Sequence, residues 1–113
     1  MNNTELILSI DVGTQSIRAV FIDLYGNIID IVKTEIEAYY SLQAGWAEQD
    51  PNHFWQKLCE TTNKLFSETD ISKDRIKALS LTTQRGTLVN VDKDGNPLRP
   101  AMVWLDQRRA ELD

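Results

Sequence analysis

A nearly continuous apolar run at residues 6–10 ends at Asp11 and passes into a short turn of small and polar residues. Apolar residues at successive positions, rather than at alternate ones, are typical of a strand buried on both faces of a sheet. A second run, at residues 17–23, is rich in the β-branched and aromatic residues that favour strands. The sequence therefore predicts a central strand that turns directly into a second one.

A third strand is expected after a turn at residues 25–27. Apolar and charged residues then alternate with the period of two that is typical of a half-exposed strand. The predicted inward face holds Ile28, Val32, Thr34, Ile36 and Ala38. Residues 1–40 therefore predict a three-stranded antiparallel meander.

A helix is expected to begin at Asp50 and Pro51. The Asp carboxylate caps free backbone amides, and Pro lacks the amide hydrogen that would be left unpaired in the first turn. A core stripe at helical spacing is predicted to comprise Trp55, Leu58, Cys59, Thr62, Leu65 and Phe66. Cys59 is expected to be an inert buried thiol. His53 has no second histidine or cysteine at ligand spacing, so a surface or packing role is expected for it.

The remaining residues predict a fourth strand and a hairpin. Residues 76–82 indicate a buried strand, which a helical crossover can place parallel to the first strand. The hairpin pairs residues 88–91 with residues 101–104 around a turn at 92–97. Residues 104–113 have the pattern of a helix that the chain does not finish, which suggests a fragment. The order predicts an incomplete α/β domain of ribonuclease-H-like fold: an antiparallel meander, a helix, a parallel strand and an added hairpin.

Composition excludes several classes of function. The chain has 113 residues with a formal net charge of −5, which argues against a nucleic-acid-binding surface of clustered Lys and Arg. One cysteine and one histidine exclude an internal disulfide, a cysteine-based zinc site and a histidine cluster. The N-terminus is not basic and the first apolar run is short, so neither a signal peptide nor a membrane span is expected. The cytoplasm is the expected compartment.

The turn after the first strand has the groups that bind the phosphates of a nucleotide. Its amides and hydroxyls can point at phosphate oxygens, and a glycine permits an unusual dihedral or a close approach. The candidate residues are Gly13, Thr14, Gln15, Ser16 and the arginine that follows, Arg18. Asp11 is placed to orient a hydrated Mg²⁺ ion. Three alternatives stay open: Asp11 caps the turn, the turn side chains bond their own backbone, or the arginine pairs with an acidic neighbour on the surface.

The predicted fold supports two chemistries. Nucleases gather several carboxylates around two metal ions, but the fourth strand ends in Thr-Thr-Gln-Arg at 82–85, without the expected carboxylate. Phosphoryl transfer from ATP needs a phosphate cradle and an acceptor site that excludes water. Candidates for gripping a polyhydroxylated acceptor are Gln84, Arg85, Trp104 and Asp106. The alternatives are a core anchor for Trp104 and a helix N-cap for Asp106.

Four motifs resemble, in order, those of the FGGY carbohydrate kinases. They lie at residues 9–18, 45–51 together with Trp55, 83–86 and 98–108. This group of glycerol, xylulose and gluconate kinases belongs to the actin/hexokinase/Hsp70 superfamily, with its actin-like ATPase fold. The resemblance implies that Asp11, Gly13, Thr14, Gln15, Ser16 and Arg18 face ATP and Mg²⁺. It also implies that Gln84, Arg85, Trp104 and Asp106 face a sugar or polyol, and that Trp46 and Glu48 fix the loop before the helix.

The resemblance further implies that residues 1–113 are the first part of the N-terminal domain of an ATP-dependent carbohydrate kinase that is cytoplasmic and homo-oligomeric. The catalytic aspartate and the adenosine-binding domain of the family then lie outside this chain, which alone is expected to be inactive. Arg85-Gly86 departs from the Arg-Glu of glycerol kinases and from the Gln-Met-His-Gly of xylulose kinases, so the sugar stays unassigned. The alternatives are a non-catalytic sugar sensor of the same superfamily and an unrelated ribonuclease-H-like binding domain.

Overall fold

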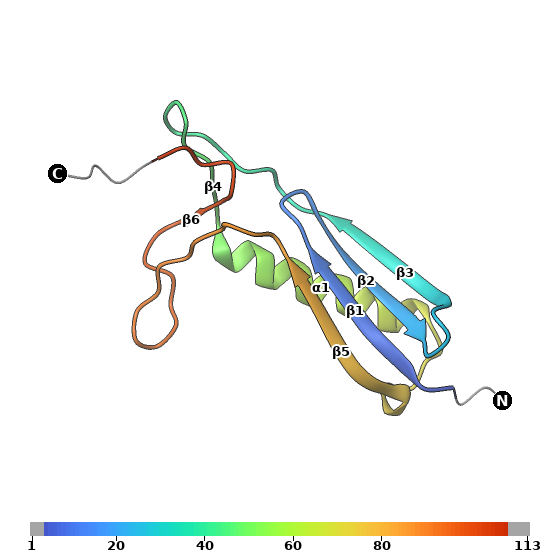
Figure 1. Ribbon diagram of the computed structural model, residues 1–113. Coiled ribbons are helices and arrows are strands. Elements are labelled where there is room, and N and C mark those ends of the chain that lie inside the picture. The colour runs from blue at the N-terminus through green and yellow to red at the C-terminus, as the bar shows by residue number, and fades with distance from the viewer. Residues whose placement is uncertain (1–3, 109–113) are drawn as a thin grey trace.

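The computed structural model describes residues 4–108. A four-stranded sheet of order β3-β2-β1-β5 has one helix packed on one face (Figure 1). Its antiparallel part is formed by β1 (Leu6–Val12), β2 (Ser16–Asp23) and β3 (Ile28–Glu35). β5 (Ile76–Thr83) pairs with β1 in parallel. The predicted meander and the parallel fourth strand are therefore confirmed.

The helix α1 (Pro51–Glu68) makes the crossover between the meander and β5, followed by a short 3₁₀ turn at Lys73–Arg75. Its start is as predicted, because the Asp50 carboxylate accepts a hydrogen bond of 3.0 Å from the Asn52 amide and Pro51 is the first helical residue. The core lies between this helix and the sheet and includes Leu6, Leu8, Ile10, Ile17, Ala19, Phe21, Val32, Ile36 and Leu65. Phe21 and Phe66 meet edge to face with ring centroids 5.0 Å apart.

Side chains of β1 alternate between the two faces of the sheet. Leu6, Leu8 and Ile10 are buried on the face that α1 covers, whereas Asp11 is exposed. Because successive side chains of a strand point to opposite faces, Asp11 lies on the face away from the helix. This alternation decides which side of the sheet carries the predicted phosphate site.

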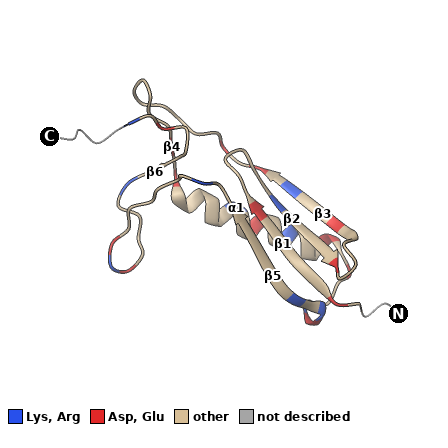
Figure 2. Ribbon diagram, in the orientation of Figure 1, with Lys and Arg blue, Asp and Glu red and all other residues tan. Residues whose placement is uncertain are grey.

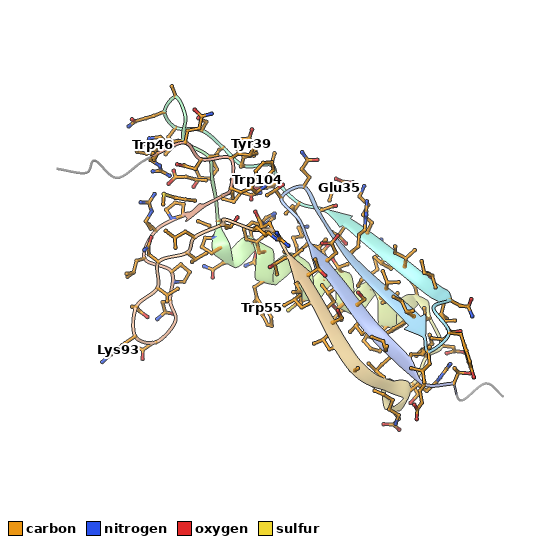
Figure 3. All side chains as sticks on the ribbon, in the orientation of Figure 1. Glu35, Tyr39, Trp46, Trp55, Lys93 and Trp104 are labelled. Carbon is orange, nitrogen blue, oxygen red and sulfur yellow. The ribbon has the colours of Figure 1, made fainter. Side chains whose placement is uncertain are left out.

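The predicted core stripe of the helix is wrong at Trp55, which is 66% exposed, and Cys59 is half-buried rather than buried. The residues of α1 that are fully buried are Thr61 and Leu65. Figure 3 shows Trp55 projecting from the helix, on the side of the open edge strand. Periodicity gives the apolar side of a helix, but burial also requires an element packed against that side.

The prediction that β5 is buried is also wrong. Leu79 is 65% and Leu81 is 57% exposed, because α1 packs over β2 and β3 and does not cover β5, which is the edge of the sheet within residues 4–108. Between β5 and the helix lies an open apolar groove of about 410 Å³, lined by Leu8, Ile10, Trp55, Leu58, Cys59, Thr62, Asn63, Leu79 and Leu81.

Ile28 was expected on the inward face of the third strand, and this prediction is wrong because Ile28 is 63% exposed. The pairing of β2 with β3 shifts register between Phe21 and Ile22, so that Ile28 lies opposite Ile22. A bulge of this kind inserts an extra residue and reverses the alternation beyond it. Further along the strand, Val32 is buried as expected.

A second, two-stranded sheet lies beyond one end of the main sheet (Figure 1). It pairs β4 (Glu48–Gln49) with β6 (Ala101–Met102). The predicted hairpin is only partly right: single bridges join Leu88 to Met102 and Val91 to Pro97, but the main partner of β6 is β4. No helix forms over residues 104–108, and the rest of the helix predicted there, residues 109–113, lies outside the described part.

Charged residues are distributed over all parts of the described chain. Lys and Arg occur on the sheet, at the start of β5 and in the loops, interspersed with Asp and Glu (Figure 2). Among residues 4–108, no helix combines the length and the apolar composition that a membrane span requires.

Candidate functional site

Two segments of the predicted site leave the main sheet at the same end. In the parallel pair of β1 and β5, Asp11 lies opposite Thr82 and Val12 lies opposite Thr83. The turn at 13–16 and the loop at 84–86 follow these residues directly. The carboxyl ends of neighbouring parallel strands are where α/β proteins place ligands, so this geometry brings the predicted phosphate turn beside the predicted acceptor loop.

A row of polar residues crosses the helix-free face at this end of the sheet. The strand pairings place Lys33, Arg18, Asp11 and Thr82 opposite one another in that order. Within residues 4–108, neither the Asp11 side chain nor the Arg18 side chain forms a hydrogen bond or an ion pair, and both residues are exposed. The alternative for Arg18, an ion pair with an acidic neighbour, is therefore not what the structure shows, and both charges are free to meet a ligand.

The turn at 13–16 is closed by its backbone. The Gly13 amide donates to the Ser16 carbonyl at 3.0 Å, and a Cβ on Gly13 would lie 3.2 Å from that oxygen. Gly13 therefore provides a close approach and not an unusual dihedral, since its φ is not positive. The side chains of Thr14, Gln15 and Ser16 make no hydrogen bond within the described residues, so the alternative in which they bond their own backbone is not observed.

The turn is also tied to the rest of the molecule through its carbonyls. The Gln15 carbonyl accepts from the Ile36 amide at 3.0 Å. The Thr14 carbonyl accepts from the side-chain amide of Gln49, also at 3.0 Å. Both contacts fix the backbone of the turn and leave its side chains unused.

In the predicted acceptor loop at 84–86, one side chain forms a hydrogen bond within the described residues and another does not. The Gln84 side-chain oxygen accepts a hydrogen bond of 2.6 Å from the Thr87 hydroxyl. Arg85 is exposed and has no partner among residues 4–108. At Gly86 the loop contacts the segment after β6, because a Cβ there would lie 3.5 Å from the Cβ of Trp104, which is 54% exposed. The structure therefore brings Arg85 and Trp104 into one neighbourhood and does not bury Trp104 as a core anchor.

Asp106 is the predicted site residue that the protein itself engages most fully. Its carboxylate accepts from the Ala47 amide at 2.8 Å and from the Arg108 guanidinium at 2.7 and 3.0 Å. The Arg108 amide also donates to it at 2.9 Å, the kind of contact expected of a capping carboxylate. The hydrogen bonds from the Arg108 side chain hold the pKa of Asp106 well below its usual range. The carboxylate is therefore ionised and fixed in place.

Comparison with known proteins identifies the family. Residues 6–112 match the N-terminal domain of the FGGY family of carbohydrate kinases. The chain belongs to this family. Its relatives include the glycerol kinases of Escherichia coli strain K12, 37% identical, and of Citrobacter koseri, 36% identical. In both cases the match covers 99% of this chain and 22% of the relative, so the chain spans about a fifth of the length of these relatives.

Solved structures of carbohydrate kinases share the fold. A xylulose kinase from Brucella ovis has a TM-score of 0.86 at 25% identity, covering 92% of this chain and 22% of that one. A glycerol kinase from Plasmodium falciparum, solved with ADP, has a TM-score of 0.77 at 33% identity, covering 93% of this chain and 21% of that one. The predicted fold class is therefore confirmed as the N-terminal part of an actin-like ATPase-fold kinase.

The structure adds residues that the sequence did not mark as part of this FGGY site. Glu48 and Gln49 are each 3% exposed, and their side chains hold the two segments that contain the predicted ligand-binding residues. Glu48 accepts from Arg99 at 2.7 Å and from Arg108 at 3.2 Å. The sequence placed Glu48 only in the loop before the helix. Its partners lie 51 and 60 residues away, and no local pattern links them.

Asp11 is the residue predicted to hold a metal ion. Among residues 4–108 no group of three or more His, Cys, Asp or Glu side chains converges. The Asp11 side chain is exposed and has no hydrogen-bond or ion-pair partner in the described part of the chain. A single free carboxylate suits Mg²⁺, which keeps several of its waters and is bound through one or two carboxylates together with substrate phosphates.

Proposed function

We propose that this chain contributes the phosphate turn and one wall of the acceptor site to an ATP-dependent kinase that phosphorylates a hydroxyl of a small sugar or polyol. The observation that carries this proposal is the placement of Asp11 at the carboxyl end of β1, with Arg18 opposite it on β2, beside the loop of Arg85 at the end of β5. All three side chains are exposed and have no partner within residues 4–108. Free charges of both signs beside a donor-rich turn are what phosphoryl transfer needs for positioning and charge stabilisation.

The phosphate half of the site uses the turn and the charges around it. The side chains of Thr14, Gln15 and Ser16 and the guanidinium of Arg18 donate to phosphate oxygens. Asp11 would hold a hydrated Mg²⁺ ion, which supplies charge neutralisation at the phosphates when bound. The glycerol kinase solved with ADP, which shares this part of the fold, supports the nucleotide assignment.

The acceptor half uses the planar fork of Arg85 and the exposed ring of Trp104. A guanidinium can hold two hydroxyls at once, and an aromatic face packs on the apolar side of a sugar ring. Gln84 and Asp106 complete the wall, with Asp106 acting through its fixed, ionised carboxylate. The names of the relatives give different acceptors, so the assay compares several acceptors to identify the sugar or polyol.

The catalytic base and the adenosine site are assigned to parts of the protein outside residues 1–113, which form the first part of the N-terminal domain. The 113-residue chain alone therefore releases no ADP. We place the protein in the cytoplasm, where its ATP is, and expect it to act as a homo-oligomer.

The test is ADP release by the intact kinase that carries this chain, with glycerol, xylulose and gluconate as acceptors. Wild-type protein should give acceptor-dependent ADP with one of these compounds or a close analogue. Asp11→Ala should reduce kcat about 100-fold or more, the usual effect of removing a group that stabilises charge in the transition state. The matched control is Asp70→Ala, an exposed carboxylate just beyond α1, at the other end of the sheet.

Two outcomes would contradict the proposal. Equal loss of activity in Asp11→Ala and Asp70→Ala would remove Asp11 from the site. A folded wild-type protein that binds ATP and releases no ADP with any acceptor would favour the sugar sensor.

A further inference from the structure

The strand β4 consists of two polar residues, Glu48 and Gln49, and both are buried at 3% exposure. Glutamate in particular is almost never buried without a partner. Adjacent residues of a strand point in opposite directions. The two side chains therefore reach different parts of the molecule, and each has a defined set of partners there.

Gln49 holds the phosphate turn. Its Nε2 donates to the carbonyl of Thr14 at 3.0 Å and to the carbonyl of Glu37 at 2.9 Å. These two bonds use both amide hydrogens and so fix which atom of the side chain is nitrogen. Its Oε1 is buried and makes no hydrogen bond within the described residues. A buried carbonyl oxygen left unpaired costs about 1–3 kcal/mol. We therefore attribute the role of Gln49 to the two hydrogen bonds that its Nε2 donates.

Glu48 holds the segment that carries the acceptor wall. Its Oε2 accepts from the guanidinium groups of Arg99, at 2.7 Å, and Arg108, at 3.2 Å. Arg108 in turn grips Asp106 at 2.7 Å. The cluster contains two carboxylates and two guanidinium groups, so its charges balance without solvent. Contact with Asp106 and Glu48 raises the pKa of Arg108, so the cation is held at all ordinary pH values.

Backbone bonds and stacking make this connection stiff. The guanidinium of Arg108 lies 4.0 Å from the centroid of the Trp46 ring. The Val103 amide donates to the Ala47 carbonyl at 3.0 Å, and the Gln107 amide donates to the Gly45 carbonyl at 2.7 Å. The segment at 45–49 therefore fixes residues 103–107 on both sides of Trp104. Figure 3 shows Trp46 and Trp104 in the same region, beyond the end of the main sheet.

We propose that Glu48 and Gln49 are positioning residues that set the acceptor wall at a fixed distance from the phosphate turn. The link runs from Thr14 through Gln49 and Glu48 to Arg108, and from there to Asp106, two residues beyond Trp104. This inference rests on the proposed function, because the distance matters only if a hydroxyl on one side attacks a phosphoryl group on the other. A misplacement of 1 Å in such a reaction lowers the rate about 100-fold.

The test uses the intact kinase with Glu48→Gln and Gln49→Met, each close to the original side chain in volume. Glu48→Gln removes the charge that holds the two arginines, so the KM for the acceptor should rise about 10-fold while the KM for ATP changes less than about 2-fold. Gln49→Met removes both donors, so the KM for ATP should rise by a similar factor and kcat should fall. Glu48→Asp keeps the charge and should recover part of the acceptor affinity.

Matched controls are Glu60→Gln and Gln56→Met, which make the same changes on the exposed surface of α1. They should leave both KM values unchanged. A purely structural role for β4 would lower the melting temperature and the active fraction of the variants without changing either KM. That result would overturn the proposal.

A second measurement tests whether Glu48 and Gln49 connect the two segments, and it does not depend on the proposed function. Amide hydrogen exchange in the same variants should accelerate about 5-fold or more on both sides of the link, since local opening is cooperative over connected units. Gln49→Met should affect Ala47 and Asp106 as well as the turn at 13–16. If each variant changes exchange only in its own half, the link does not exist. A wild type that is inactive with every acceptor would refute the kinase, and exchange would still decide the link.

Discussion

Gly86 lies against Trp104, so closely that a Cβ at position 86 would be 3.5 Å from the Cβ of the tryptophan. Its φ is +77°, in the left-handed region that residues with a side chain rarely adopt. The glycine lets the loop after β5 turn sharply and touch the segment after β6. This contact joins the two segments that we propose form the acceptor wall.

Replacing this glycine should therefore alter stability and the acceptor wall together. Gly86→Ala is expected to lower the free energy of unfolding by about 1 kcal/mol because of the left-handed backbone. It should also shift the indole N–H resonance of Trp104 in an NMR spectrum. Gly95→Ala is the control: Gly95 has a φ of +84° and nothing within 4 Å, so it should lose similar stability and leave the indole resonance in place. Identical spectra for the two variants would contradict the contact.

Asp11 should matter for activity and not for stability. It is exposed and has no partner within residues 4–108, so Asp11→Asn should change the free energy of unfolding by less than about 0.5 kcal/mol. Leu8 lies three residues earlier in the same strand and is 8% exposed in the core, so Leu8→Ala should lower the free energy of unfolding by about 2–4 kcal/mol. Urea unfolding followed by circular dichroism measures both. A loss above about 1 kcal/mol for Asp11→Asn would mean that its charge has a structural role.

Acid should loosen the segment that carries Asp106. The folded pKa of this carboxyl lies below its value in the unfolded chain, mainly because Arg108 donates hydrogen bonds to it. The unfolded chain therefore binds the proton more tightly, and folding gains stability that is complete above about pH 4 and is lost as the pH falls through the folded pKa. Asp106→Asn should flatten this dependence below about pH 4 and lower stability at neutral pH. Thermal melts between pH 2 and 7 test it, and parallel curves for both proteins would refute it.

The open groove beside β5 should make the isolated 113-residue chain self-associate. Leu79 and Leu81 are more than half exposed on β5, the edge strand of the sheet within residues 4–108, and edge strands pair with other chains. Leu81→Glu should shift sedimentation towards the monomer. Leu24→Glu is matched in exposure, 58% against 57%, but lies on a turn, and should have no effect. A wild-type chain that stays monomeric at about 100 μM would contradict this expectation.

Local patterns predicted the elements whose causes are local. Asp50 and Pro51 specify the start of α1 within two residues, and the apolar run at residues 6–10 located β1, although its side chains alternate between a buried and a less buried face rather than being buried on both. The sequence also indicated Arg85, whose side chain is exposed beside the turn at 13–16 and has no partner within residues 4–108. Each of these features depends on residues that are close together in the chain, so single-sequence reasoning reaches them.

The features that were missed depend on distant partners. Nothing near Glu48 indicates that Arg99 and Arg108 will neutralise it, or that two residues of a loop will pair with β6. The exposure of Trp55 was missed for a related reason: an apolar residue on the apolar side of a helix is buried only where another element covers it. Pairing and covering are tertiary properties, and composition or periodicity does not encode them locally.

The alternation along β1 makes the length of this strand matter more than its composition. Removing one residue between Leu6 and Ile10 would turn Asp11 towards the helix and bring a neighbour into its place, because a shift of one position reverses both faces. Conservative replacements at the same positions would keep the faces as they are. Insertions and deletions in β1 should therefore be rare among functional variants. The turns at 24–27 and 92–96 lie at the surface, so a change in their length leaves the Asp11 carboxylate in place.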